Sequence, residues 1–291
     1  MKILSPRTLR GKDFVRSFPE PVIGEAVPCD VVIPFWSGDS HWVPESVMGI
    51  AGQLHSEPVI HVIADGCDFP DDVMRLRSII PRLFLYRHER KPGQGPYRLT
   101  NSLVRHGHCK TAYLALQDAD DVSLPDRLWR QISLLQLTGA KMISSAMQQF
   151  VDAEADEQTL SRLKNEPVVK PGRVYATVPR GRCVNSMRTM TIDLFRFMNG
   201  FQNFFCSGDF EFDNRVRFGD SGSKVIDDQT ILGRRRIHAS SLSHGIAPMK
   251  SPMRNRDINM LMKSLELVRG CSSCAPNLGT MRAAFKLEVV T

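Results

Sequence analysis

The sequence lacks the features that would place the chain across a membrane or direct it to secretion. No apolar run approaches the roughly 20 residues that span a bilayer, and residues 1–21 contain no apolar stretch of the kind found in signal peptides. We therefore expect a cytoplasmic protein. Peripheral association with the inner face of the membrane stays open.

Cysteines are few and follow no disulfide pattern. There are seven, an odd number, scattered along the chain as is typical of cytosolic thiols. Cys271 and Cys274 form a lone CxxC, whereas a zinc site of this kind needs a second ligand pair. A net charge of +7, with a cluster at Arg234–Arg236, would attract phosphates or nucleic acid without distinguishing them. No nucleic-acid-binding motif accompanies it, so we expect no nucleic-acid partner.

The chain does contain the composition and the periodicity of an α/β protein. Its 291 residues are 42% hydrophobic and 24% charged, which suits one large domain or two smaller ones sharing a core. Short β-branched or apolar runs alternate with helical patterns through the first half, and the predicted strands are 30–35, 59–64, 83–86, 112–116 and 141–145. This alternation predicts a mostly parallel sheet covered by helices on both faces. The second half is less regular, with two strands expected within 174–192 and an amphipathic helix near 255–269.

Acidic residues follow two of these strands directly. Asp65 follows the second strand, and the cluster Asp118-Ala-Asp-Asp121 follows the fourth. Ligands of open parallel sheets bind beyond the carboxyl ends of the strands, and crowded carboxylates repel one another unless a cation is bound. Hard oxygen ligands suit magnesium or manganese. The alternative is that the cluster only caps the following helix, although Ser123 and Asp126 could do that alone.

These stretches resemble the family 2 glycosyltransferases, inverting enzymes with the GT-A fold. The resemblance spans roughly residues 29–245 and rests on Val31–Trp36, Val62–Gly66, Leu116–Asp121 with Pro125–Leu128, Asn199–Phe201 with Gly208-Asp209 and Arg215, and Arg236-x-His238-x-x-Ser241. It implies a GT-A domain over 29–245, made of a nucleotide-sugar half (29–150) and an acceptor half (151–245). An N-terminal arm (1–28) would precede it, and a C-terminal helical extension (246–291) would follow.

The resemblance also implies a role for each matching residue. Asp120, Asp118 and His238 would hold a manganese or magnesium ion, and Asp209 would be the general base. The nucleotide sugar would bind at Pro34, Trp36, Asp65, Asp118 and Asp121. Apart from the resemblance, Arg98 is a candidate to contact the phosphates of the nucleotide sugar, because the bidentate donors of a guanidinium suit that task. The implied reaction moves a sugar from a nucleotide-sugar donor to a hydroxyl of a saccharide or lipid-linked acceptor, as in polysaccharide or glycoconjugate synthesis.

Two departures from the family pattern keep other interpretations open. Ala64 replaces the first acid of the second-strand turn, and Gly208 replaces the usual Glu before Asp209, so that Glu211 and Asp213 remain candidates for the base. A non-catalytic nucleotide-sugar-binding protein would fit the Gly208 departure. A nucleotidyltransferase is the other alternative, but the loop after the first strand has one glycine and no Lys or Arg to hold phosphate.

Overall fold

Strand β1 (Val27–Phe35) lies in the interior of the sheet because its side chains are apolar on both faces. Val32 packs into one layer of the core, and Val31 and Ile33 pack into the other. A computed structural model describes residues 25–89, 93–152, 174–176, 187–204, 206–219, 223–238, 252–270, 272–281 and 284–290.

The first half forms the parallel part of the sheet. Strands β2 (Ser56–Asp65), β3 (Leu83–His88) and β4 (Tyr113–Leu116) run parallel to β1 in the order β3-β2-β1-β4. Each is followed or preceded by a helix, namely α1 (Val43–Ala51), α2 (Asp71–Ile79), α3 (Pro96–Arg105) and α4 (Arg127–Thr138). The predicted strands and helices of this half are confirmed, and so is the predicted α/β fold.

The second half extends the sheet with mixed pairing. Strand β8 (Arg188–Thr191) pairs antiparallel with β4 and with β6 (Met142–Phe150), and β9 (Val225–Arg236) runs parallel to β6. Two short strands, β5 (Val122–Ser123) and β7 (Val174–Ala176), add antiparallel pairs to β9 and β6. The full order is β10-β3-β2-β1-β4-β8-β6-β9-β5, with β7 beside β6.

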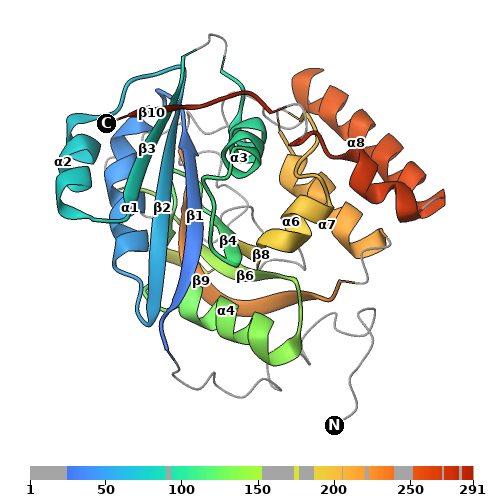
Figure 1. The fold of residues 1–291 in the computed structure, drawn as a ribbon, viewed down its shortest axis with the longest axis horizontal. Helices are drawn as coiled ribbons and strands as arrows, with labels where there is room; N and C mark the ends of the chain where they lie inside the picture. Colours follow the sequence, from blue (N-terminus) through green and yellow to red (C-terminus); the bar gives the residue numbers. More distant parts are fainter. Residues whose placement is uncertain are drawn as a thin grey trace.

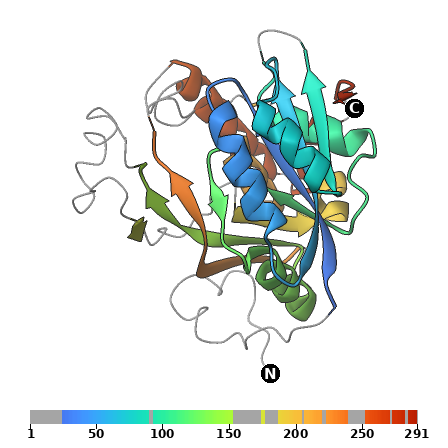
Figure 2. The same ribbon diagram turned by 90° about the vertical axis from the view of Figure 1, so that its left-hand side faces the viewer.

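Helices cover both faces of the sheet (Figure 1). Side chains of α1, α2 and α4 form one buried cluster with β1 and β2, and Figure 2 shows α1 and α2 together in front of the sheet. The other face is covered by α3 together with α6 (Ile192–Phe197), α7 (Gly208–Phe218) and α8 (Pro252–Gly270). None of the helices in the described ranges is long and apolar enough to cross a bilayer.

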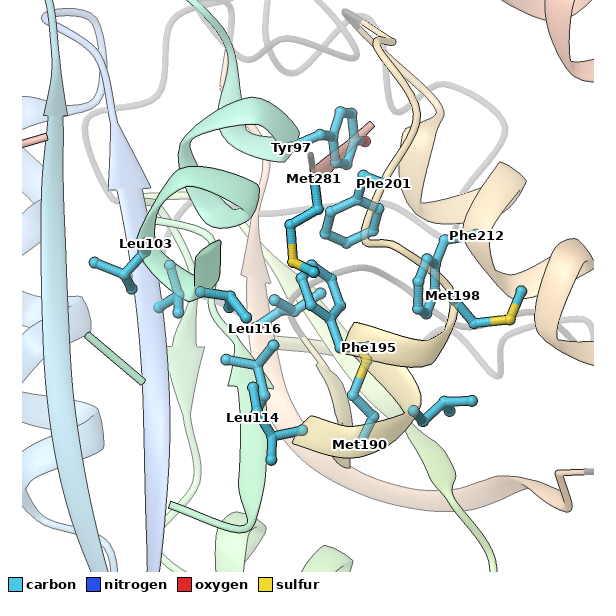
Figure 3. Close-up of a cluster of buried hydrophobic side chains, with 14 of the residues drawn as sticks. Tyr97, Leu103, Leu114, Leu116, Met190, Phe195, Met198, Phe201, Phe212 and Met281 are labelled. Carbon is cyan, nitrogen blue, oxygen red and sulfur yellow. The ribbon is translucent and has the colours of Figure 1, made fainter. Parts of the chain in front are cut away.

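An aromatic cluster joins the two halves of the chain (Figure 3). Phe201 lies with its ring centroid 5.1 Å from Tyr97 of α3, 5.3 Å from Phe195 of α6 and 5.0 Å from Phe212 of α7. The C-terminal segment packs against the same core through Leu261 and Val268 of α8. After the 3-10 helix at Ser272–Leu278, the chain adds strand β10 (Glu288–Val290) antiparallel to β3. The extension expected over 246–291 therefore supplies a strand as well as a helix.

Several sequence features lie outside the described residues. These are residues 1–24 of the expected N-terminal arm, Ser241 of the Arg-x-His-x-x-Ser stretch and Cys271 of the CxxC. The domain limits proposed from the sequence stay predictions.

Candidate active site

A buried arginine fixes the loop that carries the acidic cluster. Arg127, at the start of α4, is fully buried and donates to the Leu116 carbonyl at 2.7 Å, the Gln117 side chain at 2.7 Å and the Ser123 hydroxyl at 2.9 Å. Burial lowers the pKa of Arg127 to about 10, which leaves it charged at neutral pH beneath Asp118 and Asp121. The helix cap at Asp126 uses no side-chain hydrogen bond. Arg127 therefore holds the loop in place, and the N-cap residue of α4 makes no side-chain cap.

Two of the predicted metal-site residues, Asp118 and Asp120, meet at the carboxyl end of β4, and the third, His238, contacts Asp120. Oxygen atoms of Asp118, Asp120 and Asp121 lie within 4.8 Å of one another. His238, just beyond β9, brings its Nε2 to 2.8 Å from Asp120 Oδ2. The His238 ring is supported by Trp42, with 4.0 Å between ring centroids. Residues 118 positions apart along the chain thus form one polar cluster.

Asp39 belongs to this cluster, although it was not among the site residues predicted from the sequence. It lies in the loop after β1, and its carboxylate joins Asp120 and His238 in a group whose ligand atoms lie within 4.8 Å of one another. Burial and the negative charges of Asp120 and Asp118 raise the pKa of Asp39 to about 8. Its Oδ1 is buried and has no hydrogen-bond partner among the described residues. The only sequence signal for Asp39 was its position after a strand end.

Asp121 and Arg236 tie the end of β9 to the cluster. Asp121 is 2% exposed, and its Oδ1 accepts the backbone N–H of Arg236 at 3.1 Å. The Arg236 guanidinium donates to the Asp120 carbonyl at 3.1 Å and forms ion pairs with Glu45 and Asp152. Arg236 is therefore committed to contacts within the protein, whereas its neighbour Arg234 is exposed. In this structure Asp121 holds the backbone of β9.

Asp65 lies at the same edge of the sheet but supports a loop. Its side chain is 7% exposed, and its two oxygens accept the backbone N–H groups of Gln94 at 2.9 Å and Gly95 at 2.8 Å. A Cβ at Gly93 would lie 2.6 Å from the Asp65 carboxylate, which explains the glycine there. Asp65 thus fixes the turn that begins α3. Arg98 of that helix points toward the C-terminal segment, with its guanidinium 5.7 Å from the Phe285 ring.

Pro34 lies near the end of β1, and Trp36 directly follows that strand. Pro34 lines a narrow crevice whose other lining residues are Val32, Pro96, Tyr97, Thr100, Leu116, Gln117 and Phe201. The Trp36 indole covers Gly38, where a Cβ would lie 2.1 Å from the ring, and its side chain hydrogen-bonds to Asp39. Trp36 is therefore placed beside the acidic cluster.

Asp209 is half-buried in the first turn of α7 and faces α3. Its Oδ1 accepts a hydrogen bond of 3.0 Å from the Tyr97 hydroxyl, and Tyr97 lines the crevice beside Pro34 and Gln117. Burial and the nearby charges of Asp209 and Asp118 hold the pKa of Tyr97 well above its usual value. The Tyr97 hydroxyl therefore keeps its proton and remains a hydrogen-bond donor.

The other two candidate bases are buried in ion pairs. Glu211 is fully buried and accepts from Arg215 at 2.6 Å, Gln202 at 2.9 Å and Ser264 at 2.9 Å. Asp213 is 4% exposed and pairs with Arg217 at 2.7 Å. Among the three acids, the geometry favours Asp209 for contact with a substrate.

Arg215 links the Asn199-Gly200-Phe201 turn to α7. Arg215 donates to the carbonyls of Met198 at 2.8 Å and Gly200 at 2.6 Å, which ties the turn to α7. Gly200 has a φ of 66°, and a Cβ there would lie 2.2 Å from the Asn101 side chain. Arg215 and residues 199–201, which match the family pattern, therefore have a structural role here, because they position the helix that carries Asp209.

Comparisons with known structures give the fold class. No protein-family model and no curated protein matches the chain. Staphylococcus aureus TarS 1–349 in complex with UDP-GlcNAc aligns with a TM-score of 0.58 at 11% identity, over 82% of this chain and 66% of that one. The same protein in complex with UDP gives a TM-score of 0.57 at 12% identity, over 83% and 65%. The mannosyltransferase PcManGT from Pyrobaculum calidifontis in complex with GDP-Man and Mn²⁺ aligns with a TM-score of 0.53 at 14% identity, over 90% of this chain and 76% of that one.

These similarities concern the fold. The chain has the central sheet flanked by helices that is seen in those glycosyltransferases, so the GT-A-like fold predicted from the sequence is confirmed. The aligned region spans about two thirds of the TarS 1–349 chain and 39% of the longer TarS chain.

Proposed function

We propose that this chain is a metal-dependent, inverting glycosyltransferase that moves a sugar from a nucleotide-sugar donor to a hydroxyl of a saccharide or lipid-linked acceptor. One observation carries the proposal. The carboxyl edge of the sheet holds a cluster of acids with one histidine, and a separate half-buried carboxylate, Asp209, accepts a hydrogen bond from Tyr97, which lines the crevice beside that cluster. The likeness in fold to enzymes in complex with UDP-GlcNAc and with GDP-Man and Mn²⁺ supports the same donor class.

The donor set of the cluster suits a divalent cation. Asp118, Asp120 and Asp39 offer carboxylate oxygens, His238 offers an imidazole nitrogen, and the buried Asp39 Oδ1 without a partner is a polar atom that a cation would satisfy. Carboxylates alone suit Mg²⁺ or Mn²⁺, and the imidazole favours Mn²⁺. A bound cation would neutralise the negative charge that develops on the departing diphosphate.

The residues of the chain then have separate tasks. Pro34 and Trp36 would border the nucleoside at the end of β1, with Asp118 near the ribose. Asp65 would lie on the side of the base, where it also fixes the loop at Gln94 and Gly95, and Arg98 lies in the helix that follows this loop. Asp209 would take the proton from the acceptor hydroxyl, whose oxygen attacks the anomeric carbon opposite the leaving diphosphate. That direction of attack inverts the anomeric configuration.

A panel of nucleotide sugars tests the proposal. Purified protein would be incubated with Mn²⁺ and UDP-, GDP-, CDP- and dTDP-linked sugars, and release of the free nucleotide would be measured. We expect turnover with one nucleotide class, and loss of that turnover when the metal is chelated. Binding of a nucleotide sugar without any turnover would favour the non-catalytic alternative. Release of pyrophosphate from a nucleoside triphosphate and a sugar phosphate would favour a nucleotidyltransferase.

Asp39→Asn is expected to stabilise the metal-free protein at alkaline pH. The pKa of Asp39 is raised to about 8, so the native state holds its proton more tightly than the unfolded state does. The stability gained from that proton is complete below an unfolded pKa of about 3.9 and is lost as the pH rises through about 8. Asn carries no charge, so the variant should have a higher Tm than the wild type above about pH 8. The difference should shrink toward about pH 4, and a shift of about 2–4 °C is expected per kcal/mol of repulsion removed.

The same variant reports on metal binding. Saturating Mn²⁺ should raise the Tm of Asp39→Asn less than that of the wild type, because one donor is lost. Asp68→Asn is the control, since Asp68 is an exposed aspartate in the loop after β2. An equal response to Mn²⁺ in the wild type and in Asp39→Asn would remove Asp39 from the metal site.

A further inference from the structure

Tyr97 connects the nucleotide-sugar half of the chain with the acid proposed as the base. It lies in the first turn of α3 and is 6% exposed, with its ring above Phe201 in the aromatic cluster (Figure 3). Its hydroxyl donates to Asp209 Oδ1 at 3.0 Å, across 112 positions of sequence. The ring of Tyr97 is thus fixed by packing, and its hydroxyl meets one oxygen of Asp209.

Gly208 makes room for this tyrosine. A Cβ on Gly208 would lie 2.7 Å from Cδ2 and 2.8 Å from Cε2 of the Tyr97 ring, distances that real Cβ atoms do not show. The Glu that the family pattern has at this position could not coexist with Tyr97 as it is placed here. The glycine at position 208 therefore makes the hydrogen bond from Tyr97 to Asp209 possible, because a side chain there would displace the Tyr97 ring.

The hydrogen bond leaves Asp209 suited to act as a base. Tyr97 stays protonated, because burial and the charge of Asp209 hold its pKa well above the usual value. A donated hydrogen bond stabilises the charged form of a carboxylate and restricts its rotamer. Oδ1 is used by Tyr97, so Oδ2 is left to accept a proton from a substrate. Arg188 fixes the backbone at the same residue, with Nη1 3.0 Å from the Asp209 carbonyl.

We propose that Tyr97 is the positioning residue for Asp209, and that the glycine at 208 exists to admit it. In this chain the pair of Tyr97 and Gly208 takes the place of the acid that normally precedes the base. The inference rests on the proposed function, because it assumes that Asp209 accepts the proton of the acceptor.

Tyr97→Phe tests the inference by removing the hydroxyl and keeping the ring. We expect kcat to fall by roughly 10- to 100-fold, as is typical for loss of a group that orients a functional residue. KM for the donor should stay within about twofold, because the donor is held by other residues. The acidic limb of the pH–rate profile should move to higher pH, since the charged carboxylate loses a stabilising donor. Tyr86→Phe is the matched control, because Tyr86 is also buried and its hydroxyl contacts His61 at 3.3 Å, away from Asp209.

Gly208→Ala tests the same hydrogen bond by changing the residue that packs against the Tyr97 ring. The added Cβ should displace the Tyr97 ring, with a loss of kcat and a shift of the acidic limb like those of Tyr97→Phe. In the double variant the two losses should not add, because the hydrogen bond can be lost only once. Gly270→Ala is the control, since a Cβ at that helical glycine meets nothing within 4 Å.

Two outcomes would overturn the inference. An unchanged kcat and pH profile in Tyr97→Phe would show that the hydroxyl does not act on Asp209. A parallel loss of Tm and donor affinity with no change in the pH profile would show a purely structural role.

The failure of the inference can be told apart from the failure of the proposed function. If Asp209→Asn transfers sugar at the wild-type rate, Asp209 is not the base and the proposed mechanism fails. If Asp209→Asn is inactive while Tyr97→Phe is normal, the inference alone fails.

Discussion

Asp209→Asn should lower the rate of sugar transfer by roughly 10²- to 10⁴-fold, the range typical of losing general-base catalysis. Asn keeps the size of the side chain and can still accept the hydrogen bond from Tyr97, but it cannot take up a proton. The affinity for the nucleotide sugar should stay almost unchanged, because the proposed donor site lies at the ends of β1 and β4 and does not include Asp209. Steady-state kinetics with a saturating acceptor, together with calorimetric titration of the donor, would separate the two effects.

Three further variants show whether the loss belongs to Asp209. Asp193 also lies in the first turn of a helix and is exposed, so Asp193→Asn should transfer sugar at the wild-type rate. Glu211→Gln and Asp213→Asn would break buried ion pairs, and they should lower the Tm more than the rate of the folded fraction. If one of these two variants instead lost transfer at an unchanged Tm while Asp209→Asn stayed active, the base would be that residue.

Asp120→Asn should abolish the dependence of donor binding on metal. Asp120 is the carboxylate shared by both acidic groups at the site, and it contacts His238 directly at 2.8 Å. Loss of a residue that only supports a ligand typically costs 10- to 100-fold in metal affinity, so removal of a direct ligand should cost more than about 100-fold. Calorimetric titration of Mn²⁺ in the presence of the donor diphosphate would measure the change.

The control for Asp120→Asn is the neighbouring Asp126→Asn. Asp126 starts α4 a few residues further on and makes no side-chain cap, so its variant should bind metal and donor normally. The fold of Asp120→Asn should be intact, because the loop is held by Arg127 from beneath and not by the Asp120 carboxylate. Equal metal titrations of the wild type and Asp120→Asn would show that the cluster has only a structural role.

The parallel half of the fold could be predicted because its sequence patterns are simple. Strands β1 to β4 are short apolar runs, and acids follow β2 and β4 where ligands bind in such sheets. The acidic cluster after β4 could be located in the same way, and the structure adds Arg127 as the buried group that fixes it.

The second half could not be predicted to the same depth because its polar residues are buried. Helix α7 contains Glu211, Asp213 and Arg215, which are 4% exposed or less; Glu211 and Arg215 pair with each other, and Asp213 pairs with Arg217. Strand β9 likewise includes Asp228 and Arg236 among its buried residues. Hydropathy patterns assume that charged side chains face water, so they give no signal for either element.

Long-range contacts explain the remaining differences at the site. Asp39 gains its significance only from Asp120 and His238, which lie far away in sequence, and no local pattern marks it. From the sequence alone, Gly208 supports a non-catalytic protein. The Tyr97 ring, which occupies the space that a side chain at position 208 would need, comes from α3 and is far away in sequence. Arg98 was expected to contact phosphate, and its placement over Phe285 depends on the returning C-terminal segment.

The most direct test of the central claim is anomalous diffraction from crystals grown with Mn²⁺ and a nucleoside diphosphate. We expect one manganese peak among Asp120, Asp118, His238 and Asp39, with the diphosphate beside it and the nucleoside along Pro34 and Trp36. Asp209 would face the same space from α7, with its contact to Tyr97 kept. A manganese peak away from this cluster, or a nucleotide bound at another edge of the sheet, would contradict the proposed active site.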